Sequence, residues 1–318
     1  MLKQIQVKIS KIKYSGDSVG DDIRIEVECL DKFVGFNKKL KCGSERDAND
    51  DVGIFFVDGA SFLLPVNVKI IERDLIFNDV GSKKMDFKVN LKSNSPQSTI
   101  YKIEVQESRN FISKKKAFFE VTLEASVSDM IMYVCRDEGG WLNALPGNSK
   151  KIINLPLHLK VRMERTENGR QYFSIMEGAL QGIRASVKLN SDGEPYFSSK
   201  NTHTAPVSIT YSISKKTARF RNKVYATIDY PDSPWKKGIY DIEIPDYSHG
   251  GGHNYPEANL SSVWFLIGHE GERYFHLGKY SLGCITLTEI HKWDDLCEIL
   301  MKARKGDGRS IGALEVID

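Results

Sequence analysis

Apolar and polar residues alternate with a period of two through most of the first 127 residues. This period places successive side chains on opposite faces of a strand, and short strands at regular spacing are typical of an antiparallel sandwich. Turn clusters such as SGDSVGDD, GSERDANDD and LKSNSPQS separate the alternating segments. We therefore expect an antiparallel β-sandwich over residues 1–128. Its strands are IQVKISKIKY, DIRIEVECL, VGIFFV, FLLPVNVKII, DFKVNL, TIYKIEVQE and AFFEVTLEASV.

Residues 129–204 repeat the strand pattern in shorter, more interrupted segments. Asn168-Gly169 lies between two alternating segments, and this dipeptide is a strong signal for a two-residue hairpin turn. The pattern predicts a small β-module or an extension of the sandwich. Its strands are MYVCRD, LPLHLKVRME, QYFSIMEG and RASVKLN.

Residues 205–318 return to longer strands and then change period. VSITYSIS, TARFRNKVYATID and GIYDIEIP read as strands, and IGALEVID closes the chain. Thr288–Lys305 instead shows a helical period, with Thr288 as the candidate N-cap and Gly306 as the stop. We expect a mainly β protein with one long helix, whose apolar face is Ile290, Trp293, Leu296, Leu300 and Met301.

Composition restricts the class of partner. The chain is 41% hydrophobic and 27% charged, with a net charge of only +3. Nucleic-acid binding leaves a concentrated basic face, so we expect no nucleic-acid partner, and we interpret Lys114-Lys115-Lys116 as a solvated strand end. The first residues, MLKQIQVKISKIKY, alternate like a strand and lack the apolar core of a signal peptide. No apolar run approaches ~18 residues, so we also expect no membrane span.

Metal and cofactor signals are weak. The five cysteines are scattered without a C-x-x-C pair, and the acidic stretch Asp47–Asp51, which we interpret as a turn, lacks EF-hand spacing. His249 and His253 flank three glycines, which prevent the helix that a His-x3-His metal pair requires. We expect no metal and no cofactor. DYSHGGGHNYPEANL instead reads as an active-site lid, with His249, His253 and Tyr255 at the substrate.

The segment YFHLGKYSLGCITL carries the candidate chemistry. It combines His276 at a predicted strand end with Cys284 eight residues later, and Gly278 and Gly283 permit tight turns on either side. A cysteine nucleophile needs a base to take its proton and backbone N–H groups to stabilise the oxyanion. The segment supplies all three, provided that a hairpin VWFLIG–HEGE–RYFHLG brings the imidazole to the sulfur. A buried, inert cysteine beside a satisfied histidine is the structural alternative.

These residues resemble the signature of the L,D-transpeptidases, cysteine enzymes that act on peptidoglycan stem peptides. The family pattern is a strand ending in His-Gly, a loop, and Ser/Thr-His-Gly-Cys followed by an apolar residue; this chain offers RYFHLG and then YSLGCIT. WKKGIYDIEIP also resembles the family's Gly-x-Tyr strand, and the resemblance covers about 206–318. It implies a thioester at Cys284, His276 as base, an oxyanion hole at Gly283 and Cys284, and Ser281 as an orienting residue.

The sequence departs from the family pattern in three ways. Leu282 replaces the second histidine, Thr286 stands where the family usually has Arg or Asn at the substrate, and the His276-to-Cys284 loop is short. His269 would give a spacing closer to the usual one. We prefer His276 because it ends the second strand of the predicted hairpin, whereas His269 falls in the turn; His269 stays open as the alternative base or as a substrate contact.

The resemblance implies a peptidoglycan-modifying enzyme: an L,D-transpeptidase, or a carboxypeptidase or endopeptidase that resolves the thioester with water. Because the chain shows no export signal, we expect synthesis in the cytoplasm and action in the periplasm or cell wall. A secretion apparatus and an immunity protein are the further partners that an antibacterial effector would require. A different class of function is a non-catalytic β-rich binding or structural module of a secretion or cell-surface assembly.

Overall fold

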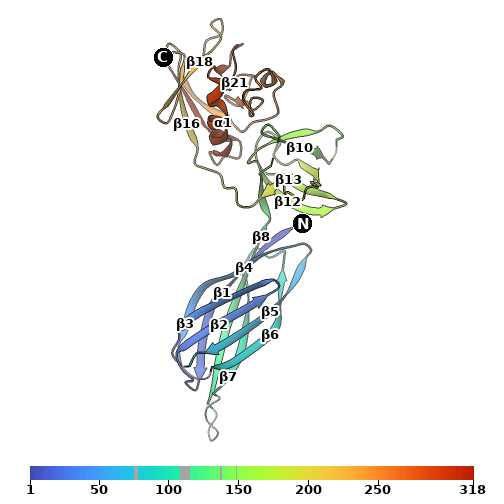
Figure 1. Ribbon diagram of the computed structural model, residues 1–318, viewed down its shortest axis with the longest axis vertical. Coiled ribbons are helices and arrows are strands. Elements are labelled where there is room, and N and C mark those ends of the chain that lie inside the picture. Colours follow the sequence, from blue (N-terminus) through green and yellow to red (C-terminus); the bar gives the residue numbers. More distant parts are fainter. Residues whose placement is uncertain (75–77, 108–114, 137, 148) are drawn as a thin grey trace. The chain divides into compact units, whose positions relative to one another are not determined.

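The computed structural model describes residues 1–74, 78–107, 115–136, 138–147 and 149–318 (Figure 1). The chain forms two compact units, Met1–Met130 and Ile131–Asp318. Strands dominate both, and α1 (Trp293–Lys302) is the single α-helix among the described residues, which confirms the predicted mainly β class. The predicted division at residues 204/205 stays a prediction. Of the predicted lysine cluster, Lys114 lies outside the described residues.

The first unit contains two four-stranded antiparallel sheets. One has the order β4-β1-β8-β7 and the other β3-β2-β5-β6. Apolar side chains from both sheets form one buried cluster, which includes Ile5 and Val7 of β1 and Ile23 and Ile25 of β2, so the sheets pack face to face as a sandwich. The strands are β1 (Lys3–Gly16), β2 (Asp22–Cys29), β3 (Lys32–Lys39), β4 (Glu45–Val57), β5 (Ser61–Glu72), β6 (Asp79–Asn90), β7 (Gln97–Gln106) and β8 (Lys116–Asp129).

Two features of the sandwich differ from the sequence expectation. β3 has no buried side chain, and an edge strand of this kind gives no clear apolar alternation. The acidic stretch Asp47–Asp51, predicted as a turn, lies inside strand β4. Neighbouring strands supply its partners: Asp50 bonds to Lys38 at 2.7 Å, and Asp51 accepts a hydrogen bond from Gln6 at 3.1 Å. A lysine of the other sheet and an amide of the neighbouring strand β1 thus compensate two of the acidic side chains.

The second unit begins with a seven-stranded sheet of order β11-β10-β14-β13-β12-β9-β15. Asn168 and Gly169 connect β12 to β13 with φ values of 50° and 70°, the positive pair that a tight hairpin turn requires, as predicted. The strands are β9 (Ile131–Val134), β10 (Trp141–Pro146), β11 (Ile153–Pro156), β12 (Lys160–Glu167), β13 (Arg170–Ile175), β14 (Arg184–Lys188) and β15 (Phe197–Ser198).

An eight-stranded sheet of order β19-β23-β16-β17-β18-β22-β21-β20 follows. It is mixed, because β16 runs parallel to β23 and β21 runs parallel to β22. Two 3-10 turns accompany it, η1 (Gly250–Asn254) and η2 (Ile290–Lys292). The strands are β16 (Val207–Ser212), β17 (Thr217–Phe220), β18 (Lys223–Ile228), β19 (Gly238–Glu243), β20 (Phe265–Leu266), β21 (Tyr274–Leu277), β22 (Ile285–Leu287) and β23 (Ser310–Ile317).

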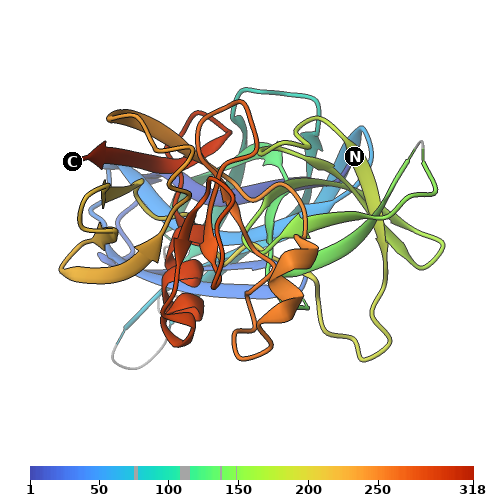
Figure 2. The ribbon, with the colours of Figure 1, turned by 90° about the horizontal axis from the view of Figure 1, so that it is seen from above.

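The helix is shorter than its sequence pattern predicts. It begins at Trp293 without a side-chain cap and ends at Lys302, so Thr288 and Gly306 are not its boundaries. Figure 2 shows the helix as a short coiled ribbon near the red end of the colour scale. Ala303 is already extended and forms a parallel bridge with Thr204. Tertiary pairing thus ends the helix before its local stop signal. Among the described residues, no helix is long and apolar enough to cross a membrane.

A buried ion pair connects the two sheets of the second unit. Arg304 Nη2 lies 2.8 Å from Glu177 Oε1, and both side chains are almost completely buried. Arg304 also donates from Nη1 to the carbonyls of Met301 and Ala303, at 2.8 and 2.7 Å. Because a buried charge is tolerated only when it is paired and hydrogen-bonded, this cluster fixes the end of α1 against the seven-stranded sheet.

Candidate functional site

A short hairpin and a parallel strand bring the candidate residues together. β20 pairs antiparallel with β21, as predicted, and β21 then pairs parallel with β22 in the register His276↔Thr286. This register sets Cys284, just before β22, beside Tyr274, whose backbone N–H donates to Cys284 Sγ at 3.4 Å. Cys284 itself lies in the bend that leads into β22, two residues before Thr286, the partner of His276. The register therefore brings the cysteine turn next to the strand that carries His276.

Cys284 is a partly exposed thiol. Burial raises its pKa, while the hydrogen bond from Tyr274 N–H and the charge of Arg273 oppose that rise. The sulfur is therefore protonated at neutral pH, and it needs a base before it can act as a nucleophile.

His276 is only 5% exposed and is neutral at pH 7, because burial lowers its pKa to about 4. Its Nδ1 lies 2.6 Å from the carbonyl oxygen of Leu277, so Nδ1 carries the proton. Nε2 is then an acceptor and takes a hydrogen bond from Thr286 Oγ1 at 3.2 Å. Among the described residues, no hydrogen bond joins His276 directly to Cys284, and Thr286 occupies the basic nitrogen.

A column of stacked rings supports His276. Trp264 stacks on His276 with ring centroids 3.9 Å apart, and it also stacks on His249 at 4.5 Å. Tyr247 extends the column beyond His249 at 4.2 Å. The Trp264 indole is oriented by its Nε1–H, which donates to Ser261 O at 3.1 Å. The stack fixes the plane of the His276 imidazole.

Asp246 joins this column to the strand beside Cys284. Its Oδ1 lies 3.1 Å from His249 Nε2, and its Oδ2 accepts a hydrogen bond from Tyr274 OH at 3.2 Å. Burial, followed by the charge of Asp246, raises the pKa of Tyr274, so the phenol keeps its proton. His249, expected at the substrate, is itself only 6% exposed and is part of the support for the site.

Ser281 and Gly283 shape the turn into Cys284. Ser281 Oγ donates to Cys284 O at 2.8 Å and accepts from Gly283 N–H at 3.3 Å, so Ser281 orients the loop and has no bond to His276 in the described residues. Gly283 has φ +125°, a conformation that side chains rarely adopt. Leu282, in the place of the family's second histidine, is 90% exposed.

His269 lies in a different cluster from the sulfur. Its Nδ1 is 2.8 Å from Glu243 Oε1, and its Nε2 is 2.9 Å from Asp241 Oδ2. The hydrogen bond to Glu243 raises the pKa of His269, because a carboxylate at each ring nitrogen favours the imidazolium. With both nitrogens held in this way, His269 has no free lone pair for Cys284.

The remaining expected substrate contacts lie in three settings. His253 is exposed on η1, and Tyr255 lies against the turn after β21, where its OH accepts from Lys279 N–H at 2.9 Å. Thr286 is fully buried and bonded to His276, which makes it part of the support of the imidazole. The structure therefore brings Thr286 to His276 and leaves His253 apart from the sulfur's neighbours.

A groove of about 920 Å³ lies beside the hairpin. One wall is residues 232–236 and the other is 267–273. Arg273 links this groove to the cysteine turn: its Nε is 3.6 Å from the point where a Cβ on Gly283 would lie. Its Cζ lies 4.8 Å over the ring of Trp235, which is itself buried in the groove wall.

Sequence reasoning missed three residues of this site, Trp264, Arg273 and Asp246. Trp264 and Arg273 lie inside the hairpin segments that were singled out, but as a strand aromatic and a strand cation they carried no motif. Asp246 opens the glycine-rich loop. The detectable signal was their place in the segments that lead into His276 and Cys284; the contacts themselves arise from packing.

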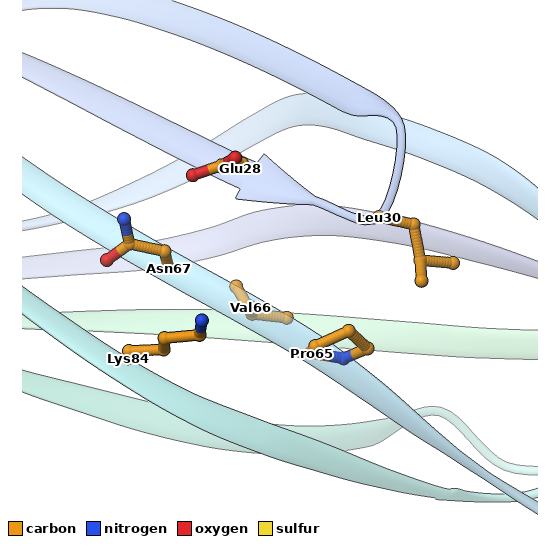
Figure 3. Close-up of a pocket in the computed structure, with 6 residues that line it drawn as sticks. All are labelled: Glu28, Leu30, Pro65, Val66, Asn67 and Lys84. Carbon is orange, nitrogen blue, oxygen red and sulfur yellow. The ribbon is translucent and has the colours of Figure 1, made fainter.

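The sandwich unit has a smaller hollow, of about 200 Å³, on the exposed side of the β2-β5-β6 strands (Figure 3). Glu28 is in register with Asn67, and Asn67 with Lys84, so a polar row crosses the three strands. Such cross-strand pairs stabilise a sheet surface. Within the described ranges, no group of three or more His, Cys, Asp or Glu side chains is arranged to hold a metal ion.

Comparisons with known proteins identify no family. No family model matches the chain, and no curated protein matches it. Among solved structures, it is similar to a C2 domain of plant extended synaptotagmin 1, at 11% identity and a TM-score of 0.25, over 39% of this chain and 93% of that one.

A second similarity is to human GIVD cytosolic phospholipase A2. The structure of that enzyme in complex with methyl gamma-linolenyl fluorophosphonate and terbium chloride matches at 11% identity and a TM-score of 0.24, over 59% of this chain. The chain spans about a third of that enzyme, with coverage of 32% there and 30% in a second structure of it. TM-scores this low assign neither family nor activity.

Proposed function

We propose that the chain is a cysteine acyltransferase or peptidase that acts on peptidoglycan stem peptides through Cys284. The observation that supports the proposal is the parallel pairing of β21 with β22, in which His276 is opposite Thr286, two residues after Cys284. A partly exposed thiol, a backbone donor to its sulfur and a nearby cation are the surroundings in which cysteine nucleophiles are activated.

The proposed reaction has two balanced steps. Cys284 Sγ attacks a peptide carbonyl as its proton passes to His276 Nε2; the C–N bond then breaks, and the leaving amine takes that proton, which leaves a thioester. An acceptor amine or water next attacks the thioester, gives its proton to the base and releases the thiol. The first outcome is transpeptidation and the second is hydrolysis.

His276 suits the role of proton acceptor in one respect and resists it in another. Burial keeps the imidazole neutral, and the bond from Nδ1 to Leu277 O leaves Nε2 as the basic nitrogen. Thr286 Oγ1–H occupies that nitrogen. In the proposed reaction the Thr286 hydroxyl rotates away from Nε2, because a base must be within reach of the proton that it takes.

The N–H groups of Gly283 and Cys284 are the proposed oxyanion donors. In the free protein Gly283 N–H donates to Ser281 Oγ at 3.3 Å. A negatively charged oxygen is a stronger acceptor than a hydroxyl, so the oxyanion would replace Ser281 at this donor. In this proposal Ser281 maintains the shape of the loop.

Action on peptidoglycan implies that the protein is delivered to the periplasm or cell wall.

A non-catalytic module is the second candidate, and a specific observation favours it. His276 has partners at both ring nitrogens, and burial raises the pKa of Cys284. A histidine satisfied in this way beside a protonated thiol is the arrangement of a structural core. In that case the second unit would bind a partner of a secretion or surface assembly without chemistry.

Intact-mass spectrometry after incubation with a carbapenem or a purified muropeptide separates the two candidates. An adduct on the wild type and none on Cys284→Ala is expected for the enzyme. Cys135→Ala is the matched control, because Cys135 is also partly exposed with a pKa raised by burial. Adducts that survive in Cys284→Ala, or no adduct and no muropeptide conversion with the wild type, would leave the binding module as the function.

A further inference from the structure

The groove beside the hairpin contains a cation whose environment is unlike that of the other charges around it. Arg273 is half-buried, and its Nη2 donates to Ser233 O at 3.1 Å and to Ser233 Oγ. Trp235 lies under the guanidinium. These contacts hold the group in one place, so a ligand would meet a preorganised cation.

This arginine has donors to spare. Over the part of the chain that the structure describes, Arg273 has no carboxylate within ion-pair distance, and its two hydrogen bonds both come from Nη2, so its Nε and Nη1 have no hydrogen-bond partner. The other strongly placed arginine of the unit, Arg304, uses its nitrogens on Glu177 and backbone carbonyls. A half-buried guanidinium with free donors is suited to a planar anion such as a carboxylate.

The charges around the groove define the ligand further. Asp232, Glu270 and Glu272 are exposed among the residues that line the groove, Lys236 is exposed in the same wall as Asp232, and His269 is bonded to Glu243. These carboxylates repel an anion that has no other recognition element, which disfavours a multiply charged phosphate. A peptide with one terminal carboxylate and an amide backbone fits better, because amides tolerate acidic neighbours and the groove has room for several residues.

We propose that Arg273 is the carboxylate receptor of a peptide-binding groove that ends at Cys284. The proposal rests on the proposed function, because it takes Cys284 as the residue that attacks the peptide carbonyl. Arg273 is close to that residue: its Nε lies 3.6 Å from the position of a Cβ on Gly283, the residue before Cys284. A carboxylate held there sets the preceding peptide bond beside the sulfur. Arg273 would then bind the carboxylate of the substrate. Thr286 is not available for this contact, because it is buried against His276.

The test uses the full chain carrying Cys284→Ala, so that no thioester can form. Isothermal titration compares a stem tetrapeptide that has a free C-terminal carboxylate with its C-terminal amide. The carboxylate peptide should bind about tenfold or more tightly than the amide, because a hydrogen bond to a charged group is worth at least that factor. Adding Arg273→Gln should remove the preference, and Arg273→Lys should restore part of it.

Arg221→Gln is the matched control. Arg221 also lies over an aromatic ring, 5.0 Å above Phe220, but it is outside the groove, so the preference should persist in this variant. Equal binding of the two peptides, no binding of either, or a preference that survives Arg273→Gln would overturn the proposal. This binding measurement does not depend on a reaction at Cys284. A carboxylate preference without acylation of the wild type would therefore contradict the proposed enzymatic activity and still support the peptide-binding groove.

Discussion

The two units of this chain differ in how many polar side chains they bury. Among the described residues, the sandwich unit buries two polar side chains, Glu72 and Asp79, whereas the second unit buries sixteen. All seven histidines and all four tryptophans of the sequence also lie in the second unit. The sandwich is built by regular alternation, and the second unit by specific side-chain partners.

The difference indicates that the second unit contains groups whose burial costs stability. A buried polar group destabilises a fold unless it is hydrogen-bonded, so a core of Val, Ile and Phe is the simpler solution. The second unit instead buries His276, Thr286 and Arg304 and satisfies each one through long-range partners. Departures of this kind from a simple core are expected at functional sites.

The largest expected effect is from Arg304→Met. The change removes the guanidinium from the buried Glu177 carboxylate, which keeps only the Lys160 N–H and the His203 ring nearby. Breaking a buried pair in this way costs about 3–5 kcal/mol. Because all the tryptophans report on the second unit, the midpoint of its fluorescence transition in urea should fall.

Arg73→Met is the control in the sandwich. Arg73 pairs with Asp22 at 3.0 Å, but both side chains are about 40% exposed, so its loss should cost less than about 1 kcal/mol. Hydrogen exchange followed by mass spectrometry assigns each loss to its unit. Equal losses in the two variants would show that buried polar partners do not distinguish the two cores.

Acid should destabilise the second unit selectively between pH 6.5 and 4. The folded pKa values of His276 and His158 are both about 4, lowered by burial from the ordinary 6.5. In this window the unfolded chain binds protons that the folded chain does not, so stability is complete above pH 6.5 and falls as the pH drops towards 4. Each histidine should contribute up to about 3 kcal/mol.

His276→Gln should remove the His276 share of this pH dependence and leave that of His158, and His253→Gln, at an exposed residue, should leave the whole dependence unchanged. The measurement is the urea midpoint of tryptophan fluorescence at a series of pH values. The sandwich contains no histidine, so its hydrogen-exchange protection should hold across the same window. A sandwich that loses protection together with the second unit would contradict the expectation.

A smaller effect is expected from Thr286→Val, which keeps the shape of the side chain and removes the hydroxyl. His276 Nε2 would then be a buried acceptor without a donor, at a cost of about 1–3 kcal/mol to the second unit. Thr286→Ser keeps the hydroxyl and should cost about 1 kcal/mol, the transfer free energy of the one methyl group that it removes. A cost for Ser with none for Val would mean that packing of the methyl group, not the hydrogen bond, holds the imidazole.

Some parts of the fold were readable because their signals are local. The alternation around Val7 and Ile25 predicted buried strand faces, and Asn168-Gly169 predicted a hairpin, because a tight turn needs residues that accept positive φ. β3 (Lys32–Lys39) was missed because its inward face is only partly buried, through Val34 and Phe36, and the strand has no fully buried residue to mark the alternation. The pairing of acidic β4 with lysines on its neighbours was also beyond local reading.

For the candidate site, the sequence by itself determined the chemical groups and the hairpin that carries them, since His276, Cys284 and the glycine turns lie within one short segment. The tertiary structure alone decided their partners. Trp264 stacking on His276, Thr286 at Nε2 and Arg273 beside Gly283 depend on which strands pair and in which register. Strand pairing is set by the packing of the whole unit, and no local pattern of residues specifies it.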